Sequence, residues 1–181
     1  MTHRQTLDPR SCASPVARAR SVFGALLVTL LLGAGVATAT AGSVSFVADG
    51  SGTAIGVPTA DPTVYTVSLI ASGQSTPLGS FRAQAHHFTD VKTGALLDGV
   101  LTLDFGSGDR LFGTYEGNEA PTTSPDTFTV GGTIRFTGGT GKLVGASGKA
   151  LFEGELHITG ISSTGIVRET VTLRLNGRLG L

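Results

Sequence analysis

The side chains best suited to chemistry in this sequence are three histidines and two glutamates. His86 and His87 are adjacent, so on a strand their side chains point to opposite faces and cannot bind one metal ion together. Glu153, Glu155 and His157 are spaced by two residues and share one face of a strand. We interpret that face as a solvated outer surface; only in a barrel with a polar interior would these residues line a cavity and serve as acid/base groups. We therefore expect neither a bound metal ion nor a cofactor.

Tyr65 is the strongest candidate for a polar group inside a pocket. It lies on the apolar face of its strand, and a buried phenol needs a hydrogen-bond partner. Tyr115, Asp104 and Glu116 are further candidates on the middle strands. The chain lacks the nucleophile elbow of a serine hydrolase, and with no Trp it has few surfaces on which a sugar could stack. The sequence assigns no catalytic residue.

A glycine-rich stretch covers residues 136–148 and separates two apolar-polar alternating runs. Its five glycines predict a tight reversal between strands, since glycine supplies positive φ and allows close backbone approach. The part Gly-Gly-Thr-Gly-Lys142 is superficially similar to a phosphate-binding loop. That loop needs Ser or Thr after the Lys and a helix after the loop, whereas Leu143 and a strand follow here. We expect Leu143 and Val144 to plug one end of a core.

The first 41 residues have the order of a secretory signal peptide. Four Arg precede an apolar, uncharged run at residues 22–36, and the small residues Ala-Thr-Ala-Thr-Ala41 follow. We predict cleavage after Ala41 or Ala39 and an exported protein, either secreted or retained in the periplasm or cell envelope. The alternative is an uncleaved anchor, although the run is shorter than the roughly 20 residues of a spanning helix. Contact with a membrane is expected only through this leader.

The remaining 140 residues, 42–181, have the length of a single domain. Cys12 lies in the leader, so the mature chain has no cysteine and no disulfide. Without the leader, nine basic and twelve acidic residues remain, a net charge of −3. Because no basic block survives to neutralise phosphates, we do not expect binding to nucleic acid.

No segment after Ala41 shows a helical period, and glycines punctuate the chain at short intervals. The pattern predicts short strands separated by turns, as in a sandwich or barrel. The eight expected strands lie at residues 43–57, 64–71, 79–89, 96–105, 110–116, 127–136, 149–159 and 165–179.

Each expected strand has one apolar face, which indicates an antiparallel sheet with one buried side. In the strand at residues 96–105, we expect Leu97, Gly99, Leu101, Leu103 and Phe105 to share the apolar face. Gly99, Gly132 and Gly154 fall on these faces and favour sharp bending of the sheet. We therefore predict an all-β fold, an eight-stranded antiparallel barrel of calycin-like architecture. The interior of such a barrel is either filled by side chains or holds one small ligand.

The stretch Gly138-Gly-Thr-Gly-Lys-Leu-Val-Gly-Ala-Ser-Gly148 resembles the Gly-Gly-Thr-Gly-Arg-Phe-x-Gly-Ala-x-Gly stretch of dirigent proteins and their bacterial relatives, in the allene oxide cyclase-like barrel superfamily. Lys142 and Leu143 stand where Arg-Phe is usual. Leu-Gly-Ser-Phe81, Leu103-Asp-Phe, Asp109-Arg-Leu-Phe-Gly-Thr and Phe152-Glu-Gly-Glu are also similar to the bacterial members. The resemblance implies an eight-stranded barrel, whose cavity in plant members binds phenoxy radicals or an oxidised fatty acid. It transfers no catalytic residue to this chain.

These observations favour an exported barrel that binds a small apolar molecule in its interior. Two alternatives stay open: a structural or interaction barrel with a packed interior, and an isomerase-like or dirigent-like enzyme acting on a lipid or phenol. An outer-membrane barrel would need outward apolar bands and aromatic girdles, which the scattered aromatic residues do not supply. No oligomeric state is predicted. The residues expected to line the ligand site are Tyr65, Phe81, Leu101, Leu103, Phe128, Ile134 and Phe152.

Overall fold

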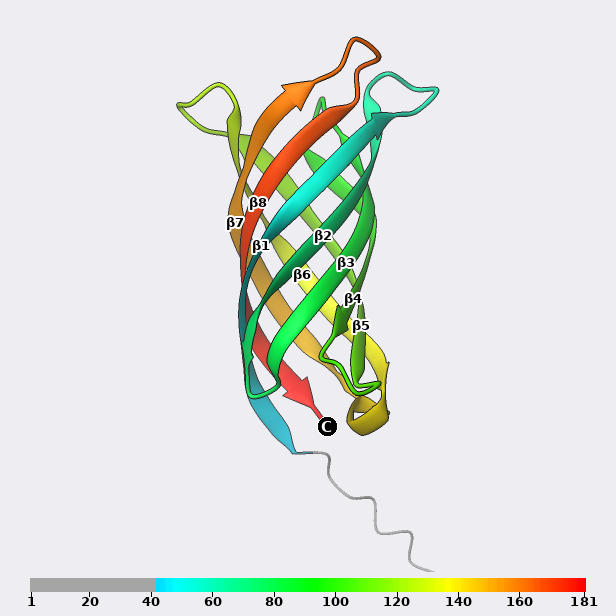
Figure 1. Ribbon diagram of the computed structural model, residues 1–181, viewed down its shortest axis with the longest axis vertical. Helices are drawn as coiled ribbons and strands as arrows, with labels where there is room; N and C mark the ends of the chain where they lie inside the picture. Colours follow the sequence, from blue (N-terminus) through cyan, green and yellow to red (C-terminus); the bar gives the residue numbers. More distant parts are fainter. Residues whose placement is uncertain (1–41) are drawn as a thin grey trace, which may run out of the picture. The chain divides into compact units, whose positions relative to one another are not determined.

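The structure, a computed structural model, describes residues 42–181. The predicted signal peptide, residues 1–41, lies outside the described residues. The described part consists of eight strands and one short 3-10 turn, which confirms the all-β prediction (Figure 1). None of the helical segments in residues 42–181 is long and apolar enough to cross a membrane.

The strands follow the chain in order around a closed antiparallel barrel, and β8 pairs with β1 to complete it (Figure 1). Their bounds are β1 Ser43–Pro58, β2 Val64–Thr76, β3 Gly79–Asp90, β4 Ala95–Asp104, β5 Arg110–Pro121, β6 Thr127–Thr140, β7 Ser147–Ile161 and β8 Val167–Gly180. The turn η1 covers Gly141–Leu143, between β6 and β7. Closure leaves no unpaired sheet edge, so nearly the whole described backbone can be hydrogen-bonded within one sheet.

The β4 strand corrects the sequence analysis in one respect. The phase predicted for this strand placed Leu97 on the inner face with Gly99, but Leu97 is 46% exposed and Leu96 is 3% exposed. An irregularity in the pairing with β5 between Leu96 and Gly99, with Asp98 at a φ of 53°, inserts a bulge that changes which residues face inward. The inward row is therefore Leu96, Gly99, Leu101 and Leu103.

One end of the barrel holds the chain termini of the described part, the β2–β3 and β4–β5 hairpins and η1; we call it the packed end (Figure 1). Phe46 and Phe136 meet edge to face there, with ring centroids 5.4 Å apart. Leu111, Leu143 and Leu179 fill the space around them and are almost fully buried. Leu143 thus plugs the core as predicted, whereas Val144 is wrongly assigned, being 73% exposed.

The glycine-rich turn is fastened to the neighbouring β4–β5 hairpin. Gly141 has a φ of +61°, the positive value predicted for a glycine of this stretch. The backbone N–H of Lys142 donates to Asp109 Oδ1 at 2.9 Å, and the Thr140 hydroxyl donates to the Gly108 carbonyl at 2.6 Å. A carboxylate already accepts the amide that a phosphate loop would present, so this stretch acts as a structural turn.

The opposite end of the barrel carries the four other hairpin loops, at residues 59–63, 91–94, 122–126 and 162–166 (Figure 1). We call it the open end. No apolar residue equivalent to Leu143 folds over it within residues 42–181. The inward side chains of each strand therefore run from the packed end, which Leu143 closes, to the open end.

Candidate functional site

Two adjoining spaces occupy the interior and the open end. The first is a small chamber of about 90 Å³ in the middle of the barrel, lined almost entirely by apolar side chains. The second is a mouth pocket of about 520 Å³ at the open end, with a mixed polar and apolar lining. Leu156 and Glu169 belong to the walls of both, so the two spaces lie next to each other.

All seven residues expected at a ligand site face one of these two spaces. Phe81, Leu101, Leu103, Ile134 and Phe152 line the chamber, while Tyr65 and Phe128 line the mouth pocket. Tyr65 is partly buried, its backbone pairs with Pro58 of β1 and Thr89 of β3, and its hydroxyl forms no hydrogen bond with another residue of the described chain. The alternating pattern therefore predicted the direction of each side chain but not its depth.

The deepest polar contact of the interior joins His87 on β3 to Tyr115 on β5. The His87 Nδ1 and Tyr115 hydroxyl atoms are 2.6 Å apart. Gly99, on the strand between them, provides the room: a Cβ at this position would lie 2.6 Å from the Tyr115 ring. The pair thus depends on the absence of a side chain at Gly99.

Phe152 supports the Tyr115 ring from the other side, with ring centroids 5.8 Å apart in an edge-to-face arrangement. A Cβ at Gly117 or Gly132 would meet the Phe152 ring at 2.8 or 2.7 Å. Two glycines on facing strands thus admit one large ring where side chains would otherwise collide. The inward glycines place aromatic groups as well as bending the sheet.

Burial keeps both members of the His87–Tyr115 pair uncharged. Loss of hydration lowers the pKa of His87 to about 4, with a smaller contribution from neighbouring His86. The same effect raises the pKa of Tyr115, and the negative charge of Glu119 adds to the rise. His87 Nε2 is buried and has no hydrogen-bond partner in the described residues. At neutral pH the pair is a neutral hydrogen bond with one unused imidazole nitrogen.

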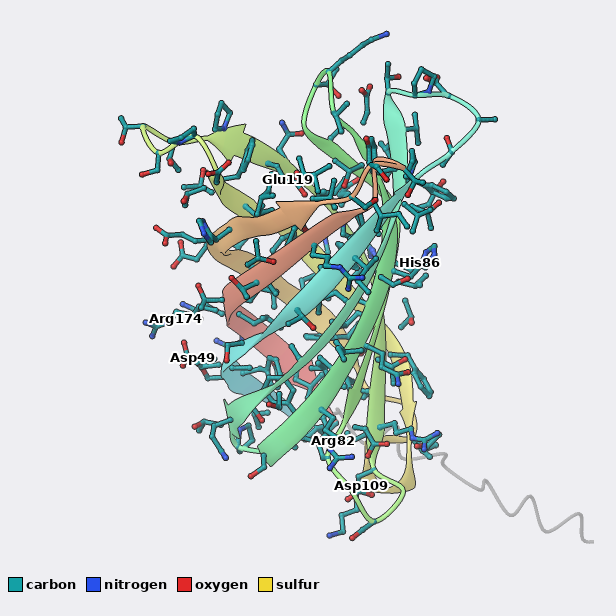
Figure 2. The ribbon with its side chains drawn as sticks, turned by 45° about the horizontal axis from the view of Figure 1, so that its top comes forward. Asp49, Arg82, His86, Asp109, Glu119 and Arg174 are labelled. Atoms are coloured by element: carbon teal, nitrogen blue, oxygen red, sulfur yellow. The ribbon has the colours of Figure 1, made fainter. Side chains whose placement is uncertain are left out.

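Two glutamates, Glu119 on β5 and Glu169 on β8, line the mouth pocket. Figure 2 shows Glu119 towards the open end, with Asp109 at the opposite end of the barrel. Burial, together with the nearby Glu169 carboxylate, raises the pKa of Glu119 to about 7. Burial also raises the pKa of Glu169. Near neutral pH this pair holds a proton that an ordinary surface glutamate would release.

Thr89 on β3 completes the polar lining of the mouth pocket. The residue is 4% exposed and its hydroxyl has no hydrogen-bond partner in the described chain. It lies close enough to Glu119 to oppose the rise of that pKa, although no hydrogen bond of standard geometry joins the two. A buried hydroxyl without a partner loses its hydration without compensation.

The other polar candidates of the sequence analysis lie on the outer surface. Glu153, Glu155 and His157 are exposed, as the solvated-face interpretation expected, and His157 Nδ1 contacts the Thr127 hydroxyl at 3.2 Å. His86 points outward in Figure 2, opposite to His87.

Asp104 pairs with Arg110 at 3.0 Å on the outer face, and Glu116 is exposed. Of the three middle-strand candidates, only Tyr115 faces the interior. In the described chain, no three His, Cys, Asp or Glu side chains cluster as a metal site would require.

The sequence analysis missed Glu119, Glu169 and Thr89. Glu119 lies beyond residue 116, where the fifth strand was expected to end, but β5 continues to Pro121. Glu169 stands two residues before the inward Val171, so the alternation of β8 already marked it as inward. Extending the alternation over charged residues would have found both.

No protein-family model matches the chain, and no curated protein or solved structure matches it either.

Proposed function

We propose that residues 42–181 form an exported barrel that binds a small apolar molecule, which enters through the open end. The observation that carries the proposal is the apolar chamber of about 90 Å³ next to the mouth pocket of about 520 Å³. Binding sites commonly combine apolar walls with a few convergent polar groups. Here the walls are the chamber and the polar groups are Thr89, Glu119 and Glu169.

The chamber size favours a slim ligand. An engineered apolar cavity of about 150 Å³ takes a benzene ring, so a chamber of this size suits an alkyl chain better than an aromatic one. Burial of such a chain contributes about 25 cal/mol per Å² of apolar area before the costs of association. Among the ligands expected from the sequence, a lipid chain therefore fits better than a phenol.

The outer surface supports a water-exposed barrel. The face opposite the apolar interior carries charged side chains along the middle of the strands, including Glu153, Arg174 and Asp49, and Figure 2 shows the last two projecting outward. Arg174 and Asp49 approach to 3.8 Å. An outer-membrane barrel has the opposite arrangement, with an apolar exterior.

Export is proposed from the leader at residues 1–41. N-terminal sequencing of protein from the culture fluid or envelope should give a chain that begins near Gly42. Recovery of intact Met1 in the membrane fraction would contradict this part of the proposal. The relation to the allene oxide cyclase-like superfamily is also proposed, on the glycine-rich stretch and the barrel that the resemblance implied.

The binding proposal is tested by titration with an environment-sensitive apolar dye, followed by competition with fatty acids and phenols. Ala83 lines the chamber, so Ala83→Leu should fill it and weaken dye binding at least about tenfold. Ala120 is exposed on β5, and Ala120→Leu is the matched control that should leave binding unchanged. Equal binding by all three proteins, or dye binding only on partial unfolding, would favour a structural barrel with a packed interior.

A second candidate function is catalysis, favoured by the Glu119 carboxyl with its pKa of about 7. Such a group can accept and return a proton near neutral pH. The isomerisation of a lipid or the coupling of a phenol would need such a proton transfer. Turnover of a bound ligand in wild-type protein, lost in Glu119→Gln with binding retained, would support this candidate. Unchanged ligand recovered from the wild-type protein would leave binding as the function.

A further inference from the structure

The mouth pocket is lined by two acidic residues and one basic residue, the exposed Lys92. Glu119 and Glu169 both line it, and in residues 42–181 neither forms an ion pair with a basic side chain. The titratable side chains that line the pocket beside them are Tyr65 on β2 and Lys92 in the loop after β3. Tyr115 on β5, which contacts His87 on β3, lies close enough to Glu119 for that charge to raise its pKa. His87 and Tyr115 are neutral, for the reasons given above, and Lys92 is an exposed rim residue.

Thr89 adds a second observation, on a strand that carries neither acid. Its hydroxyl oxygen is buried, faces the same pocket and lacks a partner. Buried polar atoms are nearly always hydrogen-bonded in folded proteins. An orphan of this kind beside two carboxyls indicates that a bound group supplies the missing hydrogen bond.

We propose that the mouth pocket binds the protonated primary amine of an alkylamine whose hydrocarbon chain extends into the apolar chamber. This inference rests on the proposed binding function and specifies its ligand class. An ammonium group has three N–H donors, which matches three acceptors here: the Glu119 carboxylate, the Glu169 carboxylate and the Thr89 hydroxyl. A carboxylate ligand would instead be repelled by the two acids.

The amine and the pocket complement each other in charge. Two glutamates close together in a partly dry site raise each other's cost of ionisation, and a cation between them removes that cost. Hydrogen bonds between ionised partners are also stronger than neutral ones. Specificity for an amine over an alcohol of equal length therefore follows from the acids, while affinity for the chain follows from the chamber.

Isothermal titration calorimetry with three probes of equal chain length tests the inference: 1-octylamine, 1-octanol and octanoate at about pH 8. We expect octylamine to bind about tenfold tighter than octanol, and octanoate to bind most weakly. At about pH 5 the Glu119 carboxyl, with its pKa of about 7, carries a proton, and the raised pKa of Glu169 favours protonation of that carboxyl too. Octylamine should then lose about tenfold in affinity while octanol keeps its own.

Glu119→Gln and Glu169→Gln should each bring octylamine close to octanol and leave octanol binding within about twofold of wild type. Glu153→Gln and Glu155→Gln, on the exposed outer face, are the matched controls and should bind all three probes as wild type does. Circular dichroism confirms that each variant is folded, and the probe comparison on wild-type protein stands without any variant.

Equal affinity for octylamine and octanol at both pH values, or tightest binding of octanoate, would overturn the amine inference and leave the binding function in place. Failure of all three probes to bind would overturn both.

Discussion

The two ends of the barrel use the same strands for different purposes. At the packed end, Phe46, Phe136 and Leu143 fill the interior and η1 is fastened over it. At the open end the inward positions hold Glu119 and Glu169, and the interior widens into the mouth pocket. Stability is therefore concentrated at one end and candidate function at the other.

This difference indicates that one end of each strand stabilises the fold and the other end contributes to the candidate site. Apolar close packing stabilises a fold, whereas buried acids and orphan hydroxyls reduce its stability and are retained where a ligand is bound. Close packing at the packed end can offset the loss in free energy of unfolding that the polar groups at the open end cause.

Two phenylalanines of β6 give the largest expected difference. Phe136→Ala, at the packed end, should reduce the free energy of unfolding by about 3–5 kcal/mol because it opens a cavity in a sealed core. Phe128→Ala, in the mouth pocket where the ring is only partly buried, should cost about 1 kcal/mol. Chemical denaturation of both variants measures the contrast, and equal losses would show that the two ends are packed alike.

Glycine substitutions give an intermediate effect. Gly141→Val should cost about 1–3 kcal/mol, because Gly141 has a positive φ and an added Cβ would collide with the Asp109 carboxylate. Gly160, near the open end of β7, has free space around its missing Cβ, so Gly160→Val should change stability by less than about 0.5 kcal/mol. Thermal melts compare the two, and unchanged midpoints for Gly141→Val would remove the strain argument.

The pH dependence of stability gives the smallest expected effect. The pKa of Glu119, about 7, lies above its ordinary value of 4.5, so the folded chain binds a proton that the unfolded chain does not between these pH values. This contribution is complete below about pH 4.5 and is lost as pH rises through 7. The pKa of His87, about 4 against an ordinary 6.5, acts in the opposite direction, since the unfolded chain binds its proton first as pH falls.

Glu119→Gln isolates the first of these contributions. On lowering the pH from about 8 to about 4.5, wild type should gain about 1–2 kcal/mol of stability relative to Glu119→Gln. Denaturation curves across this range provide the measurement, and Glu155→Gln on the outer face should follow the wild-type profile. A constant difference between wild type and Glu119→Gln would mean that Glu119 is as well hydrated as a surface acid.

The alternation of apolar and polar residues was enough to predict the barrel. All eight strands appear near their expected positions, because each inward row of apolar residues loses contact with water only when the sheet closes. The glycine-rich turn was predicted for the same local reason, since its glycines favour a reversal that other residues resist.

The polar half of the site was less predictable. Leu97 was placed inward because a strict period of two cannot anticipate the bulge at Asp98. Glu119 and Glu169 were missed because charged residues are expected on the outer surface. Their inward positions form part of a pocket only after the barrel has closed. The His87–Tyr115 contact joins residues 28 positions apart on β3 and β5, which alternation within one strand cannot bring together.

The central claim is that the interior between the two ends binds an apolar ligand, and methyl-selective NMR with 1-octanol tests it most directly. The account predicts saturable shifts for the chamber methyl groups of Leu101, Ile134 and Val171. It predicts none for Leu111, Leu143 and Leu179 at the packed end, where no space is left. Absence of shifts at high octanol, or shifts confined to outer-surface methyl groups such as those of Ile70 and Leu151, would contradict it.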